Sequence, residues 1–309
     1  MEGKIVLNKN TKFRKSSGIK ASIKQILKPK KGNRSFGGNL VLIISLALLA
    51  VIFLFPVIFM INNAFKPLSE LLRVPPFIFV RNPTLENFAA VGNLFNNSLV
   101  PFWRYVFNTF FIVTVGTLGQ IIFVSMAAYP LAKYSFFGDK FLSSLILVAL
   151  MFSPEVTAVP NYLIMANLGL IDTYFAVILP SFGSTLGLFL MKNFMSQVPS
   201  SLIEAAQIDG AGEFRTLWTV VMPAVKPAWI TLFILSFQMM WGNSGSTVIY
   251  TEALKPLSAA LNQIAAVLPV ARMGETMVVS LIMFLIPVTI FIFMQSNVLE
   301  TMTTSGIKE

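Results

Sequence analysis

The sequence predicts an all-α polytopic membrane protein with six transmembrane helices. The 309-residue chain is 55% hydrophobic and only 12% charged, and its mean hydropathy is +0.75. Soluble globular domains carry about 25% charged residues, so composition alone indicates a membrane protein. The apolar stretches are continuous and lack the period-two alternation of barrel strands, which makes the expected spans helical.

Six apolar stretches are each long enough to cross a hydrocarbon core of about 30 Å at about 1.5 Å per residue. They lie near residues 39–63, 104–131, 141–164, 173–192, 227–249 and 276–298. A basic tail, residues 1–38, precedes the transmembrane domain of residues 39–309. A polar loop at about 195–225 interrupts that domain.

The basic residues predict the orientation. With the N-terminus in the cytoplasm, seventeen of the 23 Lys and Arg residues fall on the cytoplasmic side, eleven of them within residues 1–34. This bias predicts that both termini and the polar loop are cytoplasmic. The tail adjoins an apolar span and lacks interleaved aromatic residues, so we expect it to contact anionic lipid rather than nucleic acid. The apolar run that follows is too long for a signal peptide, whose core has about 7–15 residues.

The residue types that are missing exclude several chemistries. The chain has no Cys and no His, which removes disulfides, thiolate and imidazole metal sites, and His-based acid–base catalysis. It also lacks the G-x-x-x-x-G-K-[ST] phosphate loop, so it cannot hydrolyse ATP in that way. We therefore expect no metal and no cofactor in this chain, and no enzymatic activity.

The polar loop carries the signals of two short helices. Ser201 with Glu204 three residues later forms a capping box, in which Glu204 satisfies backbone donors at a helix start. Asp209-Gly210 and Gly212 then break the helix in a turn, where Gly210 is expected to adopt a backbone conformation that a side chain opposes.

An apolar face at spacings of three and four residues marks the second short helix, which Pro223 and Pro227 end. Its residues are Phe214, Leu217, Trp218 and Val221. Two short amphipathic helices between spans are, on general grounds, typical of interfacial helices that lie on the membrane.

The loop also matches a specific pattern, E-A-A, three residues, Gly, nine residues, then Ile-x-Leu-Pro. The matching run is Glu204-Ala205-Ala206-Gln207-Ile208-Asp209-Gly210-Ala211-Gly212, closed by Val220, Met222 and Pro223. It resembles the cytoplasmic EAA loop of the membrane subunits of ATP-binding-cassette importers, with two conservative apolar changes. In that family the loop is the coupling helix, which rests in a cleft of an ATPase subunit.

The resemblance implies partners as well as site residues. It implies an ATPase dimer that binds ATP and Mg on the cytoplasmic side, a second permease chain that is different and larger, and an extracytoplasmic solute-binding protein. The chain would then lie in the cell membrane of a bacterium or archaeon. By position, the ATPase-coupling role falls on Glu204, Ala205, Ala206, Asp209, Gly210, Ala211, Gly212 and Pro223.

Residues 40–309 extend this resemblance to the smaller membrane subunit of maltose-type sugar importers. The matching segments are Tyr129–Tyr134 with Phe136 and Gly138, Leu168–Tyr174 with Pro180, Phe189–Phe194 with Val198-Pro199, and the tail Thr303–Lys308. One segment departs from the pattern. Those subunits often carry Trp-Asn-Asp/Glu-Phe late in the fifth span, whereas this chain has Trp241-Gly242-Asn243-Ser244-Gly245 and lacks the acid.

Sugar recognition needs aromatic faces and planar hydrogen-bonding groups inside a cavity. The candidates for a substrate path are Gln238, Trp241, Asn243, Glu155 and Asn108, together with Gln120. Gln238 and Trp241 are three residues apart and can share a helix face. Other roles stay open: interfacial snorkelling for Glu155, an aromatic belt for Trp241, and interhelical hydrogen bonds for Asn108 and Gln120.

The resulting hypothesis is a permease subunit that imports a sugar or oligosaccharide by alternating access. The alternatives are an importer of another small solute, such as an amino acid, phosphate or a polyamine, an autonomous channel, or a membrane enzyme. Against the enzyme, the spans hold no His, Cys or clustered carboxylates. Against the channel, no ring-forming filter motif is present.

The topology is testable because the chain has no native cysteine. Single cysteines at Ser17 and Ser305 should react with an impermeant maleimide only from the cytoplasmic side, and one at Asn82 only from outside. Labelling in right-side-out and inverted vesicles measures this. Reaction of the Asn82 position from the cytoplasm would refute the six-span arrangement with the N-terminus inside.

Overall fold

The computed structural model describes residues 36–75, 77–96, 100–266 and 272–305. Every regular element in these ranges is a helix, which confirms the all-α prediction. The chain divides into two compact units, one that ends at Val57 and one that begins at Ile58. The basic residues 1–34 and residues 306–309 of the expected C-terminal motif lie outside the described ranges.

The helices fall into two groups along the chain, before and after the start of the polar loop. The first group is α2 (Phe36–Ala64), α3 (Leu68–Leu71), α4 (Glu86–Asn96), α5 (Phe102–Lys133), α6 (Asp139–Ala149), α7 (Pro154–Asn167), α8 (Phe175–Phe182) and α9 (Thr185–Ser196). The second group is α10 (Ser200–Ile208), α11 (Glu213–Thr216), the π-helical turn η1 (Leu217–Val221), α12 (Met222–Ala224), α13 (Lys226–Gly242), the 3-10 turn η2 (Glu252–Leu254), α14 (Leu257–Ala266) and α15 (Met273–Ser305).

Four stretches in the described ranges are long and apolar enough to cross a membrane. They are Leu40–Ala64, Phe102–Lys133, Phe175–Ser196 and Met273–Gln295. A fifth is present if Glu213–Ala224 and Lys226–Gly242, which meet at a bend of 85°, form one broken span. These stretches agree with five of the six expected spans, whereas the count of six and the orientation stay predictions.

The expected span at 141–164 is not one helix. It consists of α6, with 11 residues, and α7, with 14 residues, separated at residues 150–153. The break comes from proline: the residue before Pro154 is extended, with ψ of 152° at Ser153, because the proline ring disfavours helical backbone there. Each piece alone is shorter than the roughly 20 residues that a single crossing needs.

Helix α5 is the centre of the second unit. It packs against α8 and α9 on one side and against α13 on another, and thirteen of its residues are buried. Its middle shares one apolar cluster with α8 and α13. The half that ends at Lys133 shares another with α9 and the polar loop. The burial of apolar side chains on α5 therefore ties most of the bundle together.

Gly119 shows how closely α8 approaches α5. A Cβ atom built at this position would lie 2.1 Å from the Phe182 ring, a separation that non-bonded carbons do not reach. The Phe182 ring is also stacked on the ring of Phe123, which lies on α5 four residues after Gly119, with centroids 4.9 Å apart. Only glycine at position 119 allows this contact, as in other closely packed membrane helices.

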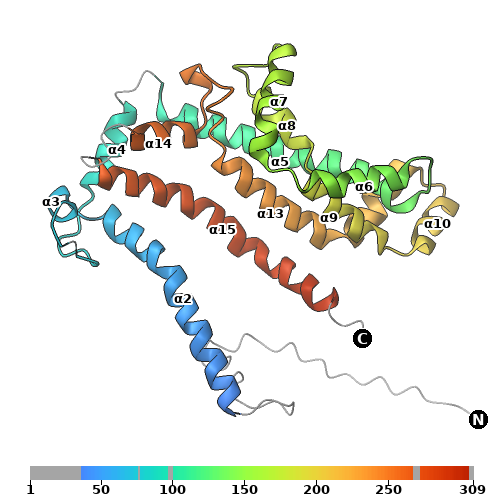
Figure 1. Ribbon diagram of the computed structural model, residues 1–309, viewed down its shortest axis with the longest axis horizontal. Helices are drawn as coiled ribbons and strands as arrows, with labels where there is room; N and C mark the ends of the chain where they lie inside the picture. The colour runs from blue at the N-terminus through green and yellow to red at the C-terminus, as the bar shows by residue number, and fades with distance from the viewer. Residues whose placement is uncertain (1–35, 76, 97–99, 267–271, 306–309) are drawn as a thin grey trace, which may run out of the picture. The chain divides into compact units, whose positions relative to one another are not determined.

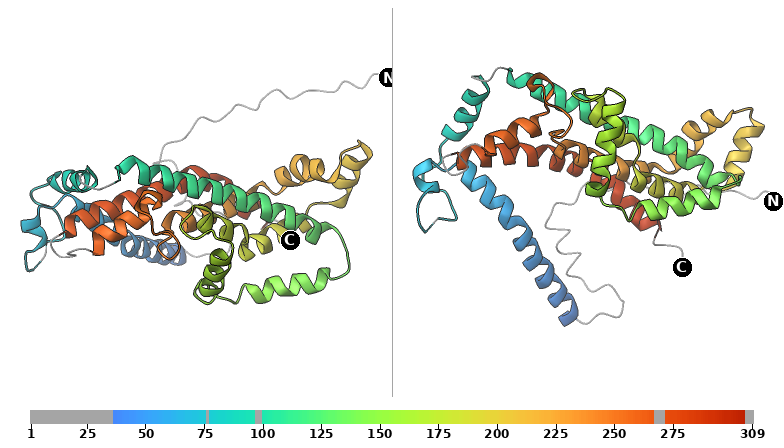
Figure 2. Two further views of the ribbon diagram at one scale, coloured as in Figure 1. Left: turned by 90° about the horizontal axis from the view of Figure 1, so that it is seen from above. Right: turned by 45° about the horizontal axis from the view of Figure 1, so that its top comes forward.

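The two ends of α5 meet different parts of the chain. Figures 1 and 2 show α10 beside one end of α5 and α14 beside the other. The end at Lys133 adjoins the polar loop, and the end at Phe102 adjoins η2 and α14. Both candidate sites described below lie at these ends.

Candidate functional site

The polar loop begins differently from the sequence prediction. Helix α10 starts at Ser200 and Pro199 occupies the N-cap position, with no side-chain hydrogen bond to the helix start. Ser201 is therefore already inside the first turn, and the predicted capping box with Glu204 is wrong. Proline suits the position before the helix because its missing N–H leaves no donor unsatisfied there. Glu204 is exposed and free of that structural role.

Gly210 ends α10 in the predicted way. Its φ is +80°, in the left-handed region that only glycine adopts at low cost. The N–H of Gly210 donates to the carbonyl of Gln207 over 3.0 Å, and the N–H of Ala211 donates to that of Ala206 over 2.9 Å. This pair of bonds is a Schellman motif, which satisfies the last carbonyls of the helix. The conformational prediction for Gly210 is confirmed.

The predicted apolar face of the second helix is only partly present. Leu217 and Val221 are buried and Trp218 is partly buried, but Phe214 is 65% exposed. Residues 217–221 form a π-helical turn, which has more residues per turn than an α-helix. The spacing of three and four residues therefore does not keep these four side chains on one face.

The loop has one anchored face and one open face. Ile203, Leu217 and Val221 pack in the apolar cluster of α5 and α9. The open face carries Ile208, which is 86% exposed, together with Phe214. Its other exposed members are Leu202, Glu204, Ala205, Asp209 and Gly210. An exposed apolar surface rimmed by two carboxylates is typical of a protein-docking surface.

A carboxylate inside the loop binds the end of α5. Glu213 accepts hydrogen bonds from the hydroxyls of Tyr129 over 3.1 Å and Tyr134 over 2.6 Å, and from the Gln207 amide over 3.0 Å. The bond from Tyr134 is the main cause that holds the pKa of Glu213 below its ordinary value, which keeps it charged. Lys133 donates to the carbonyls of Ser196 and Val198. We call Tyr129, Lys133, Tyr134 and Glu213 the inner junction.

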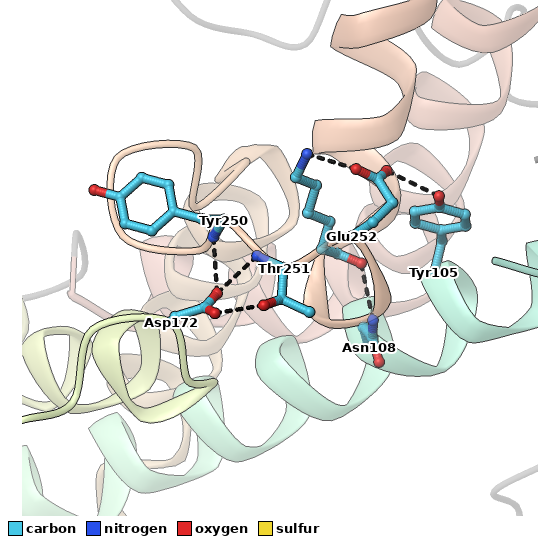
Figure 3. Close-up of polar contacts among 7 residues, drawn as sticks. Tyr105, Asn108, Asp172, Tyr250, Thr251 and Glu252 are labelled. Carbon is cyan, nitrogen blue, oxygen red and sulfur yellow. Dashed lines mark hydrogen bonds and ion pairs between the residues drawn. The ribbon is translucent and has the colours of Figure 1, made fainter. Parts of the chain in front are cut away.

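At the other end of the bundle, Asp172 fixes the segment that follows α13 (Figure 3). Its carboxylate accepts from the N–H groups of Tyr250 and Thr251, each over 2.8 Å, and from the Thr251 hydroxyl. Asp172 has a φ of +63°, which is unusual outside glycine. The bonds from Thr251 and Tyr250 lower the pKa of the Asp172 carboxyl, with the Thr251 hydroxyl contributing most.

Helix α5 contributes the second half of this outer site. Asn108 donates to the carbonyls of Ala253 and Lys255, each over 2.9 Å, and accepts from the Tyr174 hydroxyl over 2.7 Å. Figure 3 shows Tyr105 beside Glu252, whose carboxylate accepts from the tyrosine hydroxyl over 2.9 Å. We call Tyr105, Asn108, Asp172 and their partners at residues 250–255 the outer junction.

The predicted path residues lie in different surroundings, some buried and some exposed. Asn108 is fully buried and its amide bonds to backbone. Trp241 is 3% exposed, stacks on Phe237, and donates from its indole nitrogen to the Met283 carbonyl over 3.0 Å. Gln238 lies three residues before Trp241 on α13 but is exposed, whereas Trp241 is buried. A role for these residues in a substrate path stays a prediction.

The remaining candidates lie apart from one another. Glu155 is exposed in the first turn of α7, and Gln120 is buried in the middle of α5. Asn243 is exposed, and its side-chain oxygen accepts from the N–H of Gly245 over 2.9 Å, which shapes the turn after α13. Within the described ranges, no group of three or more acidic residues is placed to hold a metal ion.

A cavity of about 360 Å³, which we call the polar cavity for the polar groups among its otherwise mainly apolar lining, lies beside the outer junction. Its lining includes Ser244, Ser246, Tyr250, Lys255, Asn262 and Gln263. These side chains supply hydroxyl, amide and ammonium groups and one aromatic ring. The volume lies within the range of about 300–1,000 Å³ that is usual for small-molecule sites. Sequence reasoning did not find this cavity, because no local pattern predicts how the turn after α13 folds against α14.

Trp241 should matter first for stability. Trp241→Ala removes a buried aromatic side chain and should lower the free energy of unfolding by about 3–5 kcal/mol, whereas Trp241→Phe keeps most of the stacking. Thermal unfolding of the purified chain in detergent measures this, with Trp103→Ala as the control because Trp103 is 63% exposed. Equal midpoints for the two alanine variants would contradict a packing role.

The outer junction should depend on pH through Asp172. Because the folded pKa of Asp172 is lowered, its stabilising bonds are fully present above the ordinary carboxyl pKa and are lost as pH falls through the lowered value. Amide exchange at Tyr250 and Thr251, corrected for intrinsic rates, should therefore rise only at strongly acidic pH. Asp172→Asn should raise it at neutral pH, whereas Glu86→Gln should not. Unchanged exchange in Asp172→Asn would refute the assignment.

Comparisons with known proteins agree with this arrangement. Residues 120–303 match the family described as binding-protein-dependent transport system inner membrane components. The chain is 33% identical over 225 residues to protein LplC of Bacillus subtilis (strain 168), which covers 72% of this chain and 74% of that protein. It is 28% identical over 262 residues to the arabinooligosaccharides transport system permease protein AraQ of the same organism, covering 84% and 92%.

A solved structure shares the fold. With a TM-score of 0.72 and 22% identity, the chain resembles one chain of a bacterial ABC transporter involved in the import of the acidic polysaccharide alginate. The match covers 87% of this chain and 99% of that one. At this level of identity the likeness concerns the arrangement of helices.

Proposed function

We propose that this chain, which belongs to the family of binding-protein-dependent transport system inner membrane components, is the subunit through which an ATP-driven importer moves a sugar or oligosaccharide. It is a multi-pass protein of the cell membrane and a permease of the carbohydrate-uptake type. The relative named for arabinooligosaccharide transport and the alginate importer support a carbohydrate as the cargo.

The observation that carries the proposal is the two-faced loop around Gly210. One face is packed on α5 and α9, and the other exposes Ile208, Phe214 and two carboxylates. A loop that only lay on the membrane would turn its apolar side chains toward lipid and its polar ones away. Here the apolar and acidic groups share the open face, which suits a protein cleft with apolar walls and basic residues.

The proposed partners follow from the open face of the loop and from the family resemblance. An ATPase dimer would bind ATP and Mg and receive the loop, a second and larger permease chain would complete the translocation path, and an extracytoplasmic binding protein would deliver the sugar. The chain itself is the non-catalytic subunit. Closure of the ATPases would push the loop and favour one of two packings of the helices, which is alternating access.

The polar cavity beside the outer junction is consistent with a carbohydrate cargo. Its hydroxyl and amide groups and the Tyr250 ring are suited to sugar hydroxyls and to the apolar face of a pyranose. The rival assignments are an importer of another small solute, a channel or a membrane enzyme. Binding assays with the partner binding protein separate the solutes. Co-purification with an ATPase and a second permease separates an importer from a channel or an enzyme.

The coupling role of the loop is tested at Gly210. Gly210→Leu forces a left-handed backbone on a residue with a side chain, at a cost of about 1–2 kcal/mol, and should weaken ATPase docking or uncouple hydrolysis from uptake without affecting insertion. Glu204→Lys should do the same, because it places a cation against a basic partner surface. Glu204→Ala should have a smaller effect. ATPase co-purification and sugar uptake in membranes are the measurements.

Gly138→Leu is the matched control. Gly138 has a φ of +95° and open space around it, so the substitution brings a similar strain outside the loop. It should leave docking and uptake close to those of the unsubstituted chain. Normal assembly and uptake in both Gly210→Leu and Glu204→Lys would show that the loop is only an interfacial helix pair.

A further inference from the structure

We propose that α5 transmits the movement of the coupling loop, residues 195–225, to the outer loop, residues 243–256, and that Glu213 is the positioning residue that attaches the coupling loop to α5. This inference rests on the proposed docking of an ATPase on the coupling loop. It assigns a task to two sequence segments, Tyr129–Tyr134 and Leu168–Tyr174, that the docking surface itself does not use.

Glu213 is set apart from the other acids of the loop by its contacts. Its carboxylate accepts from two tyrosine hydroxyls of the α5 exit and from Gln207 of α10. Hydrogen bonds to a charged acceptor are roughly twice as strong as those between neutral groups. All three acids are exposed, but only Glu213 is held by these bonds to α5 and α10, whereas Glu204 and Asp209 lie on the open face. The loop thus has acids for a partner and a separate acid for its own bundle.

A second contact restrains the same end of α5. Lys133 donates to the carbonyls of Ser196 and Val198, where the chain enters the loop. Tyr129 and Tyr134 also pack edge to face, with ring centroids 5.8 Å apart. The chain before α10 and the chain after it are therefore both bonded to the last turn and exit of α5, so a shift of the loop acts on α5 from two sides.

Helix α5 is suited to carry such a shift over a long distance. It is continuous over 32 residues from Phe102 to Lys133, which is about 48 Å at 1.5 Å per residue. Its one internal proline, Pro130, lies in the last turn. By contrast, α8 and α9 are separated at Gly183, and α12 meets α13 at a bend of 85°. Breaks of this kind absorb movement instead of passing it on.

At the far end of α5, side chains of the helix form hydrogen bonds with the backbone of the outer loop. Arg104 and Asn108 donate to the carbonyl of Ala253, and Asn108 also donates to that of Lys255. The Thr109 hydroxyl accepts from the N–H of Leu257 over 2.7 Å. Asp172 restrains the preceding residues, Tyr250 and Thr251. The outer loop is thereby bonded both to α5 and to the segment before α8, and it also lines the polar cavity.

The arrangement makes a reciprocal prediction. If the loop and the outer site are coupled through α5, a ligand that acts at one end must change the state of the other by the same free energy. Contact alone does not demonstrate coupling. Coupling would be demonstrated by a reporter at the outer loop that responds to nucleotide at the distant ATPase and loses this response when Glu213 is changed.

The experiment uses the assembled importer in proteoliposomes with one cysteine, at Thr247, an exposed outer-loop residue. The rate of its reaction with an impermeant maleimide is measured without nucleotide and after trapping with MgATP and vanadate. In the otherwise unsubstituted chain, we expect trapping to change the rate by about fivefold or more, the lower end of usual allosteric couplings. Glu213→Ala should reduce that change to less than about twofold, with the ATPase still bound.

Conservative and matched variants distinguish a positioning role of Glu213 from a general loss of folding or assembly. Glu213→Gln keeps an acceptor and should restore part of the response. Tyr134→Phe removes the shortest bond to Glu213, and its combination with Glu213→Ala should be no worse than the stronger single change, as expected for one shared interaction. Asp139→Asn, which changes a half-buried carboxylate at the start of α6, should behave like the unsubstituted chain. If Glu213→Ala does not accumulate, Tyr134→Phe alone should show the reduced response.

Two outcomes are decisive. A full response in Glu213→Ala or Tyr134→Phe, with the ATPase bound, would overturn the role of the inner junction and leave the proposed function intact. The absence of any response in the unsubstituted assembly would overturn transmission by α5. If no ATPase co-purifies with the unsubstituted chain, the proposed function itself fails, and this inference fails with it.

Discussion

Hydrocarbon offers no partner for a backbone polar group, so a membrane protein can join separate segments by strong polar contacts only where helices emerge or where protein surrounds them. The second unit of this chain follows that constraint along one helix. The middle of α5 is packed by apolar side chains of α8 and α13. Its polar side chains at the two ends make the bonds that link distant segments. The apolar middle positions α5 in the bundle, and the two junctions determine which segments are hydrogen-bonded to its ends.

The two junctions differ in kind. The inner junction relies on side chains at both partners, a carboxylate and two tyrosine hydroxyls. The outer junction relies mainly on backbone groups of the outer loop, which Asn108 and Asp172 bind from two sides. A loop bound through its backbone can present different side chains to a cargo without losing its position.

The sequence predicted what local patterns encode. Long apolar runs marked the spans around α5 and α15, and the Asp209-Gly210 pair marked the end of α10, because apolar length and glycine conformation depend on near neighbours in the chain. The capping box failed because the N-cap is Pro199, two residues before the Ser201 that the spacing to Glu204 requires. The span at 141–164 failed as a single helix because hydropathy does not register the restriction that Pro154 places on Ser153.

The junctions were beyond local patterns because their partners are far apart in sequence. Tyr134 and Glu213 are separated by 79 residues, and Asp172 and Tyr250 by 78. No periodicity pairs them, and only the resemblance of Tyr129–Tyr134 and Leu168–Tyr174 to family segments singled out one side of each pair.

The partners of Asn108 and Trp241 could not be predicted for the same reason. Both are polar or amphipathic residues in spans, which sequence reasoning offered as candidates for a substrate path. Their partners, the carbonyls of Ala253, Lys255 and Met283, are supplied by segments that only the fold brings near. A polar residue in a span is therefore as suited to fixing a neighbouring segment as to meeting a substrate, and the identity of its partner decides between the two.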